Sequence, residues 1–177
     1  SGTTYSGTVK ATVGGCESAD VAYTQTALTT PVITVSASAA PCEGGSITFT
    51  ATSLPGATYT WTGDASSTTN VATINSVTSG TTYSGTVKAT VGGCESADVA
   101  YTQTALTTPV ITVSASAAPC EGGSITFTAT SIPGATYTWT GDASSTTNVA
   151  TVNSVTSGTT YSGTVKATVG GCESADV

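Results

Sequence analysis

The chain has 177 residues, of which 38% are hydrophobic and only 7% are charged, and its formal net charge is -7. It contains three lysines and neither arginine nor histidine, so it offers no basic surface for nucleic acid and no imidazole for an ordinary catalytic triad or metal site. No run of 18 or more apolar residues occurs, so we expect no membrane insertion by this segment. We therefore expect neither an enzyme nor a cofactor-binding protein.

The sequence is a tandem repeat in which segment 1–78 recurs almost letter for letter as 79–156. The repeat then starts a third time, because 157–177 matches both 1–21 and 79–99. The two differences are Leu54 against Ile132 and Ile74 against Val152. Each replaces one apolar side chain by another of similar size, which a core tolerates. A near-identical array of this kind is typical of a spacer, a filament or a display device.

Alternation of apolar and polar residues predicts strands in the first half of the repeat. The first expected strand is 32–37. In the second, 46–52, the alternation places Phe49 on the inner face, and in the third, 57–62, it places Trp61 there. Threonines take the outer face, which suits them because they are β-branched and form hydrogen bonds.

The second half of the repeat continues the same pattern. Residues 63–70 are a polar loop with room for a short edge strand. We expect a fifth strand at 71–77, a sixth at 83–91 and a seventh at 95–104, before the linker 105–108. No stretch has the periodicity of a helix.

About seven short strands per repeat, with turns every 8 to 12 residues, predict an all-β fold of tandem immunoglobulin-like sandwiches. Residues 1–28 are expected to be the last two strands of a preceding repeat. Residues 29–106 are then a complete repeat, and 107–177 are the next repeat, truncated in its last strand.

Several aromatic residues are expected to be core landmarks of such sandwiches. Trp61 lies in the third strand, Phe49 in the second, and Tyr83 opens the sixth strand, where a tyrosine corner would be. Their counterparts one period later are Phe127, Trp139 and Tyr161.

The chain resembles the bacterial immunoglobulin-like repeats of large secreted or surface adhesin-type proteins. Such repeats are common in Bacteroidetes, often near gliding or adhesion proteins. The matching segments are 41–51, 55–61, 81–83 and 93–96. The resemblance covers the whole repeat and implies an extracellular or cell-surface location. It is more specific for the fold than for the function, because these modules are generic building blocks.

The acidic and basic residues indicate no metal site and no crosslink. No Asp-x-Asp-x-Asp run occurs, and a calcium ion needs several converging oxygen ligands. A Lys-to-Asn isopeptide bond would need a buried lysine. The alternation in the sixth strand instead turns Lys88 to water.

The cysteines carry the most testable chemistry. There are five: Cys16, Cys42, Cys94, Cys120 and Cys172. Each complete repeat has two. The absence of Cys-x-x-Cys and of histidine favours a disulfide in an oxidising, extracellular setting over zinc.

The expected topology limits which cysteines can pair. Cys42 precedes the second strand and Cys94 begins the seventh, so the two lie at opposite ends of one sandwich, on the order of 30 Å apart. Bridged Cα atoms are about 4.4 to 6.8 Å apart. In a linear array the end with Cys42 meets the next repeat at Cys172, so the favoured pair is Cys42 with Cys172. An intradomain bridge in a modified topology, and free or interchain thiols, are the alternatives.

These observations predict a structural protein, namely a component of an extracellular bacterial filament or a long surface adhesin stalk, stiffened by disulfides. Its partners are neighbouring repeats of the same chain and identical chains in a filament. The alternative is a glycan- or surface-binding adhesin module that acts by avidity through loops such as 63–70.

Overall fold

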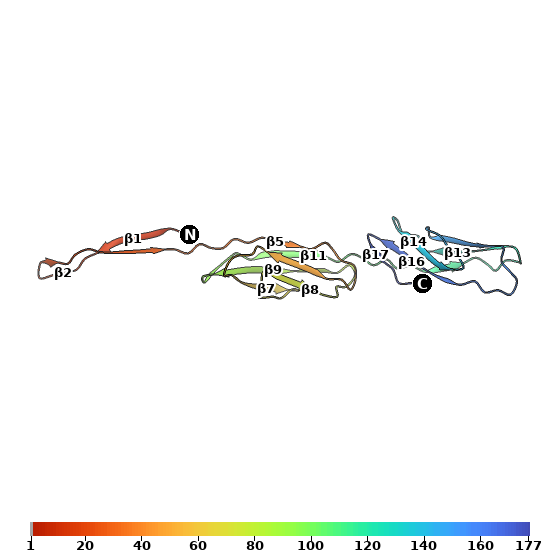
Figure 1. Cartoon of the computed structure of the whole chain (residues 1–177), viewed down its shortest axis with the longest axis horizontal. Coiled ribbons are helices and arrows are strands. Elements are labelled where there is room, and N and C mark those ends of the chain that lie inside the picture. Colours follow the sequence, from red (N-terminus) through yellow and green to blue (C-terminus); the bar gives the residue numbers. More distant parts are fainter. Residues whose placement is uncertain (1) are drawn as a thin grey trace. The chain divides into compact units, whose positions relative to one another are not determined.

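The computed structural model describes residues 2–177, and these form strands, turns and loops without a helix (Figure 1). The expectation of an all-β chain is confirmed. By contacts, the chain divides into two compact units. The first comprises residues 2–38, Thr48–Ile74 and Tyr83–Gln103, and the second comprises Ala39–Ile47, Asn75–Thr82 and Thr104–Val177. A search of residues 2–177 for a long apolar helix that would cross a bilayer found none.

Two sheets form a sandwich between residues 35 and 104. Its strands are β5 (Val35–Ala37), β6 (Ile47–Ala51), β7 (Thr58–Gly63), β8 (Val71–Ile74), β9 (Thr82–Val91), β10 (Cys94–Glu95) and β11 (Val99–Thr104). One sheet has the order β5-β6-β8. In the other, β9 pairs with β7, β10 and β11. This division of the strands is that of an immunoglobulin-like sandwich.

The core of this sandwich follows from the alternation along β6 and β7. Phe49 has no exposed surface, and its neighbours two residues away on β6 are also buried, whereas Thr50 is exposed. On the facing sheet, Trp61 is buried as well. The ring of Tyr101, from β11, lies 4.4 Å from that of Phe49 and 5.4 Å from that of Trp61 between ring centroids. Aromatic rings from both sheets thus meet in one cluster.

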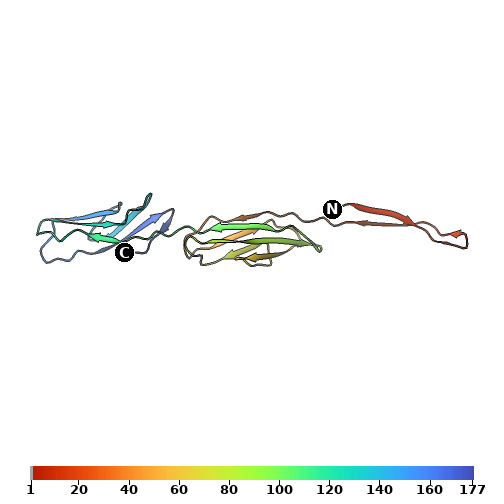
Figure 2. The same ribbon diagram turned by 180° about the vertical axis from the view of Figure 1, so that it is seen from behind.

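The same pairing recurs in the next repeat (Figures 1 and 2). The strands there are β12 (Val113–Ala115), β13 (Ser124–Ala129), β14 (Thr136–Gly141), β15 (Val149–Asn153), β16 (Gly163–Val169) and β17 (Cys172–Glu173). The sheets are β12-β13-β15 and β14-β16-β17. The pair Val35↔Ala51 of the first sandwich corresponds to Val113↔Ala129 of the second. Identical sequence therefore adopts identical register.

The second core is more open than the first. Trp139 packs at the margin of a cluster that includes Tyr137 and Val165, and both Trp139 and Phe127 are half-buried.

Residues 4–26 form a hairpin with the sequence of 82–104. Its strands are β1 (Thr4–Val9), β2 (Thr12–Val13), β3 (Cys16–Glu17) and β4 (Val21–Thr26). β1 and β4 are antiparallel in the register Thr4↔Thr26 to Val9↔Val21. Tyr23 is 58% exposed, whereas the corresponding Tyr101 is 4% exposed. Within residues 2–177, nearly all residues of β1 and β4 are exposed.

Three strands differ from those expected. The first strand is shorter than expected, at 35–37, because the hydroxyl of Thr52 accepts a hydrogen bond from the N–H of Thr34 (3.0 Å). The fifth ends at Ile74, before Ser76 adopts a positive φ of 55°. The seventh is divided into β10 and β11 around Ser96. Gly63 ends β7, and residues 64–70 of the expected loop contain no strand.

Candidate functional site around the Cys42–Cys172 disulfide

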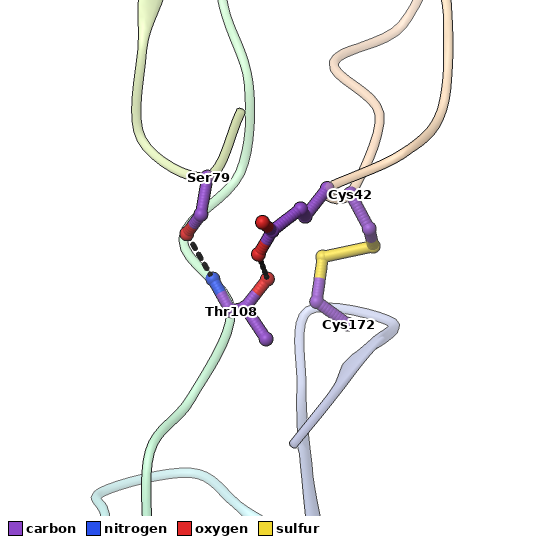
Figure 3. The surroundings of a disulfide bond; sticks show 5 residues. Cys42, Ser79, Thr108 and Cys172 are labelled. Carbon is purple, nitrogen blue, oxygen red and sulfur yellow. Dashed lines mark hydrogen bonds between the residues drawn. A yellow bond between two sulfur atoms is a disulfide. The ribbon is translucent and has the colours of Figure 1, made fainter. Parts of the chain in front are cut away.

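Cys42 and Cys172 form a disulfide in the structure, with their Cα atoms 5.5 Å apart (Figure 3). This separation lies within the usual range for bridged cysteines. Both residues belong to the second compact unit. Cys172 is almost completely buried. The bond joins positions 130 residues apart in sequence, which is more than the length of one 78-residue repeat.

Tight turns present the two cysteines. Cys172 follows Gly170 and Gly171, which both have positive φ (58° and 87°) and connect β16 to β17. Two such residues favour the hairpin turn that matches the twist of the strands. On the other side, the N–H of Gly45 donates to the carbonyl of Cys42 (3.0 Å). The bond therefore connects two turn regions.

Hydrogen bonds connect the linker 105–108 to the segment that carries Cys42. The N–H of Leu106 donates to the carbonyl of Pro41 (2.9 Å). The hydroxyl of Thr108 donates to the carboxylate of Glu43 (3.4 Å). The N–H of Thr108 donates to the hydroxyl of Ser79 (2.8 Å), as Figure 3 shows. The peptide chain at Thr108 and the disulfide thus lie close together.

The other three cysteines occupy the same two places in the repeat. Cys16 and Cys94 follow Gly-Gly turns as Cys172 does, and Cys120 corresponds to Cys42. Within residues 2–177 these three form no disulfide; Cys16 and Cys120 are exposed and Cys94 is half-buried. The bond between Cys42 and Cys172 therefore uses one cysteine of each kind.

The two tyrosines that were expected to open the sixth strand are half-buried; Tyr83 lies in β9, and Tyr161 lies two residues before β16. The hydroxyl of Tyr161 accepts a hydrogen bond from the N–H of Thr156 (2.9 Å), five residues upstream. This is the contact expected of a tyrosine corner. Tyr83 occupies the same position one period earlier and is also half-buried.

The two tryptophans make the same hydrogen bond. The indole Nε1–H of Trp61 donates to the carbonyl of Thr69, and that of Trp139 donates to the carbonyl of Thr147, both at 2.8 Å. Each ring therefore anchors the polar loop that follows its strand. A buried indole usually has such a partner.

Tyr101 is a structural landmark that the sequence reasoning missed. Its hydroxyl donates to the carbonyl of Thr62 (2.8 Å) and accepts from the N–H of Ala65 (2.9 Å). The ring lies against Gly85, where an added Cβ would come within 2.7 Å of ring atoms. A tyrosine on the seventh strand, with a glycine on the sixth, is the signal that would have identified this contact.

Each lysine forms an ion pair with the glutamate seven residues later. The Nζ of Lys88 lies 2.8 Å from Glu95, and that of Lys166 lies 2.9 Å from Glu173. The hydrogen bond to Glu95, followed by the charge of that carboxylate, raises the pKa of Lys88 above its ordinary value. Glu173 raises the pKa of Lys166 in the same way. These pairs lie on an exposed sheet face.

A shallow depression beside β7 recurs beside β14. The first has a volume of about 580 Å³ and the second about 550 Å³. Its lining in the first sandwich is Tyr59, Thr60, Trp61, Ser66, Ser67 and Thr68. The side chains of Tyr59 and Trp61 are each only 6% exposed. The depression therefore presents hydroxyls and little aromatic surface on which a sugar ring would stack.

The acidic and sulfur-containing side chains do not converge on a cation site. Among residues 2–177, no group of three or more His, Cys, Asp or Glu residues is placed to hold a metal ion. The carboxylate of Asp64 instead accepts the N–H of Ser84 (2.7 Å), and that of Asp142 accepts the N–H of Ser162 (2.7 Å). These two carboxylates stabilise loops of the sandwiches.

Comparison with known proteins found solved structures but no family. No protein-family model matches the sequence, and no curated protein matches it. One chain of the crystal structure of a mouse coronavirus receptor-binding domain complexed with its murine receptor is 12% identical, with a TM-score of 0.40, over 82% of this chain and 98% of that one. Murine CEACAM1b is 13% identical, with a TM-score of 0.38, over 81% and 95%. A chimeric titin Z1Z2 is 16% identical, with a TM-score of 0.31, over 83% and 94%. The immunoglobulin-like assignment rests on the strand order described above.

Proposed function

We propose that this chain is a structural component of an extracellular bacterial filament or of a long surface adhesin stalk. In this proposal residues 29–106 are one complete repeat, 107–177 belong to the next, and the hairpin before residue 29 closes a preceding one. The observation that carries the proposal is the Cys42–Cys172 disulfide, because it joins successive repeats. A spacer or filament needs many identical joints, and the near identity of the repeats provides them.

The joint in this proposal has two covalent connections. One is the peptide chain through Leu106 and Thr108, and the other is the disulfide. A single peptide linker rotates about its φ and ψ angles, whereas a second connection removes that freedom. The hydrogen bonds of Pro41, Glu43 and Ser79 to the linker act in the same direction. The proposed joint is therefore stiff.

The same chemistry supports an extracellular location. Disulfides persist in oxidising compartments and are rare where thiols are kept reduced. Because the cysteines recur at only two positions, the same bond can form at every joint of a longer array. Cys120 would then pair with a later cysteine and Cys94 with an earlier one, each at the sequence separation of the Cys42–Cys172 bond.

Non-reducing peptide mapping of the chain tests this assignment. Trypsin followed by a glutamyl endopeptidase separates Cys16 from Cys42 and leaves Cys42 in fragment 18–43 and Cys172 in fragment 167–173. We expect these two fragments to be linked. The Cys120→Ser variant should retain the link, and the Cys172→Ser variant should lose it. A disulfide between fragment 18–43 and fragment 89–95, which carries Cys94, would refute the stapled joint, that is, the proposed disulfide between successive repeats.

A glycan array separates the structural role from the adhesin-module alternative. The depression beside β7 buries both of its aromatic rings, and in the one beside β14 Tyr137 is buried and Trp139 is half-buried, so we expect the chain to bind no glycan. Binding that disappears on Ser67→Ala with Ser145→Ala would assign the sugar-binding role instead. Electron microscopy of the native material should show long threads with a regular axial repeat.

A further inference from the structure

The Cys42–Cys172 disulfide encloses almost all of both sandwiches. Cys42 precedes β6 and Cys172 begins β17, so the enclosed loop contains the strands from β6 to β16. Of the two sandwiches, only β5 and β17 lie outside that loop. We propose that this bond allows tension along the chain to bypass both sandwiches, so that their unfolding adds almost no length.

The covalent path explains the bypass. Tension applied at the two ends of the chain reaches Cys42 through the residues before it. It crosses the bond, where the Cα atoms are 5.5 Å apart, and leaves through the residues after Cys172. About 46 residue steps carry the load, and they extend to about 160 Å. Without the bond all 177 residues carry it, and the chain extends to about 600 Å.

In an array of repeats joined by such disulfides, two load-bearing covalent paths alternate along the chain. That such an array exists is part of the proposed function, on which this inference rests. The stretches 16–42 and 94–120 have the same length, and each is far shorter than the 130 residues that the bond spans. One path uses the stretch 16–42, the Cys42–Cys172 bond and the corresponding stretch that starts at Cys172. The other path uses the stretch 94–120. Each path therefore has one such short stretch for every two repeats.

The resulting limit on extension is short. A single stretch such as 94–120 extends to about 90 Å, whereas two unstapled repeats would extend to about 530 Å. The ten residues of β9 already span about 33 Å when folded. The fully extended path is therefore about 1.4 times as long as two such folded strands, whereas two unstapled repeats would reach about 8 times that length. Such a filament lengthens little under load, even when individual sandwiches unfold.

The stretches that carry the load are themselves held by hydrogen bonds. The stretch 94–120 contains β10, β11 and β12, so force acts first on strands at the margins of their sheets. In the corresponding earlier stretch, 16–42, the N–H of Thr52 donates to the carbonyl of Thr34 (2.9 Å). We expect these marginal strands to detach before force reaches the other strands of the sandwiches.

Optical tweezers test the inference on the chain as it is, with handles at its two ends. In oxidising buffer we expect a maximum extension of about 160 Å. Adding dithiothreitol should release about 440 Å more, and the Cys172→Ser variant should show the full length without reductant. The Cys120→Ser variant is the matched control and should behave as the parent chain does.

Peptide mapping of the same sample separates the two possible failures. If fragments 18–43 and 167–173 are linked and the oxidised chain still extends to about 600 Å, the load bypass is wrong while the stapled joint stands. If the fragments are not linked, the stapled joint itself is wrong, and the bypass is rejected with it.

Discussion

The side chain of Tyr101 contacts residues of both sheets of the first sandwich. Its ring contacts Phe49 on one sheet and Trp61 on the other, and its hydroxyl bonds to Thr62 and to the buried N–H of Ala65. A buried N–H that loses its acceptor costs the full desolvation of that group. Stability here therefore depends on the hydroxyl as well as on the ring.

The Tyr101→Phe variant should lose about 1 to 3 kcal/mol of unfolding free energy, because the ring stays and only the hydroxyl is removed. Urea unfolding followed by tryptophan fluorescence measures this in a Trp139→Phe background, where Trp61 alone reports. The matched control is Tyr23→Phe, at the exposed counterpart in the hairpin, which should leave the midpoint unchanged. Equal effects of the two variants would contradict the role given to Tyr101.

The ion pair of Lys88 predicts a specific dependence on pH. Its pKa is raised above the ordinary 10.5, chiefly by the hydrogen bond to Glu95. A raised pKa in the folded state stabilises the fold below the unfolded value, and this stabilisation is lost as pH rises through the folded pKa. Because the pair is solvent-exposed, the effect on stability is small.

A titration of the Lys88 Cε chemical shift checks this prediction. We expect the midpoint to lie above 10.5 in the parent chain and to fall towards 10.5 in Glu95→Gln, because the first cause of the shift is removed. Asp98→Asn should lower it less, since Asp98 contributes the smallest part. An unchanged midpoint in Glu95→Gln would show that Glu95 is not the cause.

Individual core residues were predictable where local alternation determines their side. The alternation placed Phe49 and Trp61 inside, and both are buried. The hydroxyl contacts of Tyr101 were not predictable in this way. Their partners are Thr62, at the end of another strand, and Ala65, in a loop, and only the packing of the two sheets brings them to the tyrosine.

At the scale of the strand, side-chain hydrogen bonds decide where pairing stops. The hydroxyl of Ser96 accepts the N–H of Ala89 (3.0 Å) and donates to the carbonyl of Ala97 (2.8 Å). This side chain takes the place of a backbone partner, so the predicted strand 95–104 is divided into β10 and β11. Serine side chains compete with the backbone in this way.

The Ser96→Ala variant should lose about 1 kcal/mol of unfolding free energy, because the N–H of Ala89 on β9 loses its hydrogen-bond acceptor. That amide should then exchange with solvent more readily. Hydrogen exchange measured by NMR should show faster exchange at the amide of Ala89. Ser18→Ala makes the same change in the exposed hairpin, where Ser18 binds the N–H of Ala11 (3.0 Å), and should leave Ala89 protected. Unchanged exchange at Ala89 in Ser96→Ala would contradict this explanation.

The strand boundaries show how accurately the alternation alone predicts where a strand begins and ends. Strand 46–52 was predicted almost to the residue, since β6 covers Ile47–Ala51. The predicted strand 71–77 is shorter because Ser76 adopts a left-handed backbone, which no apolar pattern indicates. Alternation identifies which residues face the core, but turns and side-chain bonds determine where a strand ends.

At the scale of the whole molecule, the disulfide should contribute to stability as well as to stiffness. It closes a loop of 130 residues, and the chain-entropy model assigns such a loop as much as about 5 kcal/mol. Reduction should therefore lower the urea midpoint of the parent chain. The Cys94→Ser and Cys120→Ser variants should show the same midpoint as the parent, because neither residue takes part in the bond. A midpoint that does not respond to reduction would contradict the prediction.

The overall architecture was the most predictable level, because a short repeat with several alternating segments permits few arrangements. The all-β class follows from the composition and the alternation. The contacts around the disulfide were less accessible. Glu43, Ser79 and Thr108 carry no distinctive sequence signal, and they come together only when three separate loops of the second unit meet.

The lysines lead to one further consequence. Each repeat has a single lysine amine, and in Lys88 and Lys166 a neighbouring glutamate keeps it protonated. An acylating dye reacts only with the neutral amine, so mildly alkaline labelling would proceed slowly. Once complete, it would place one fluorophore in every repeat. A labelled thread would then serve as a molecular ruler, with marks whose spacing the sequence itself determines.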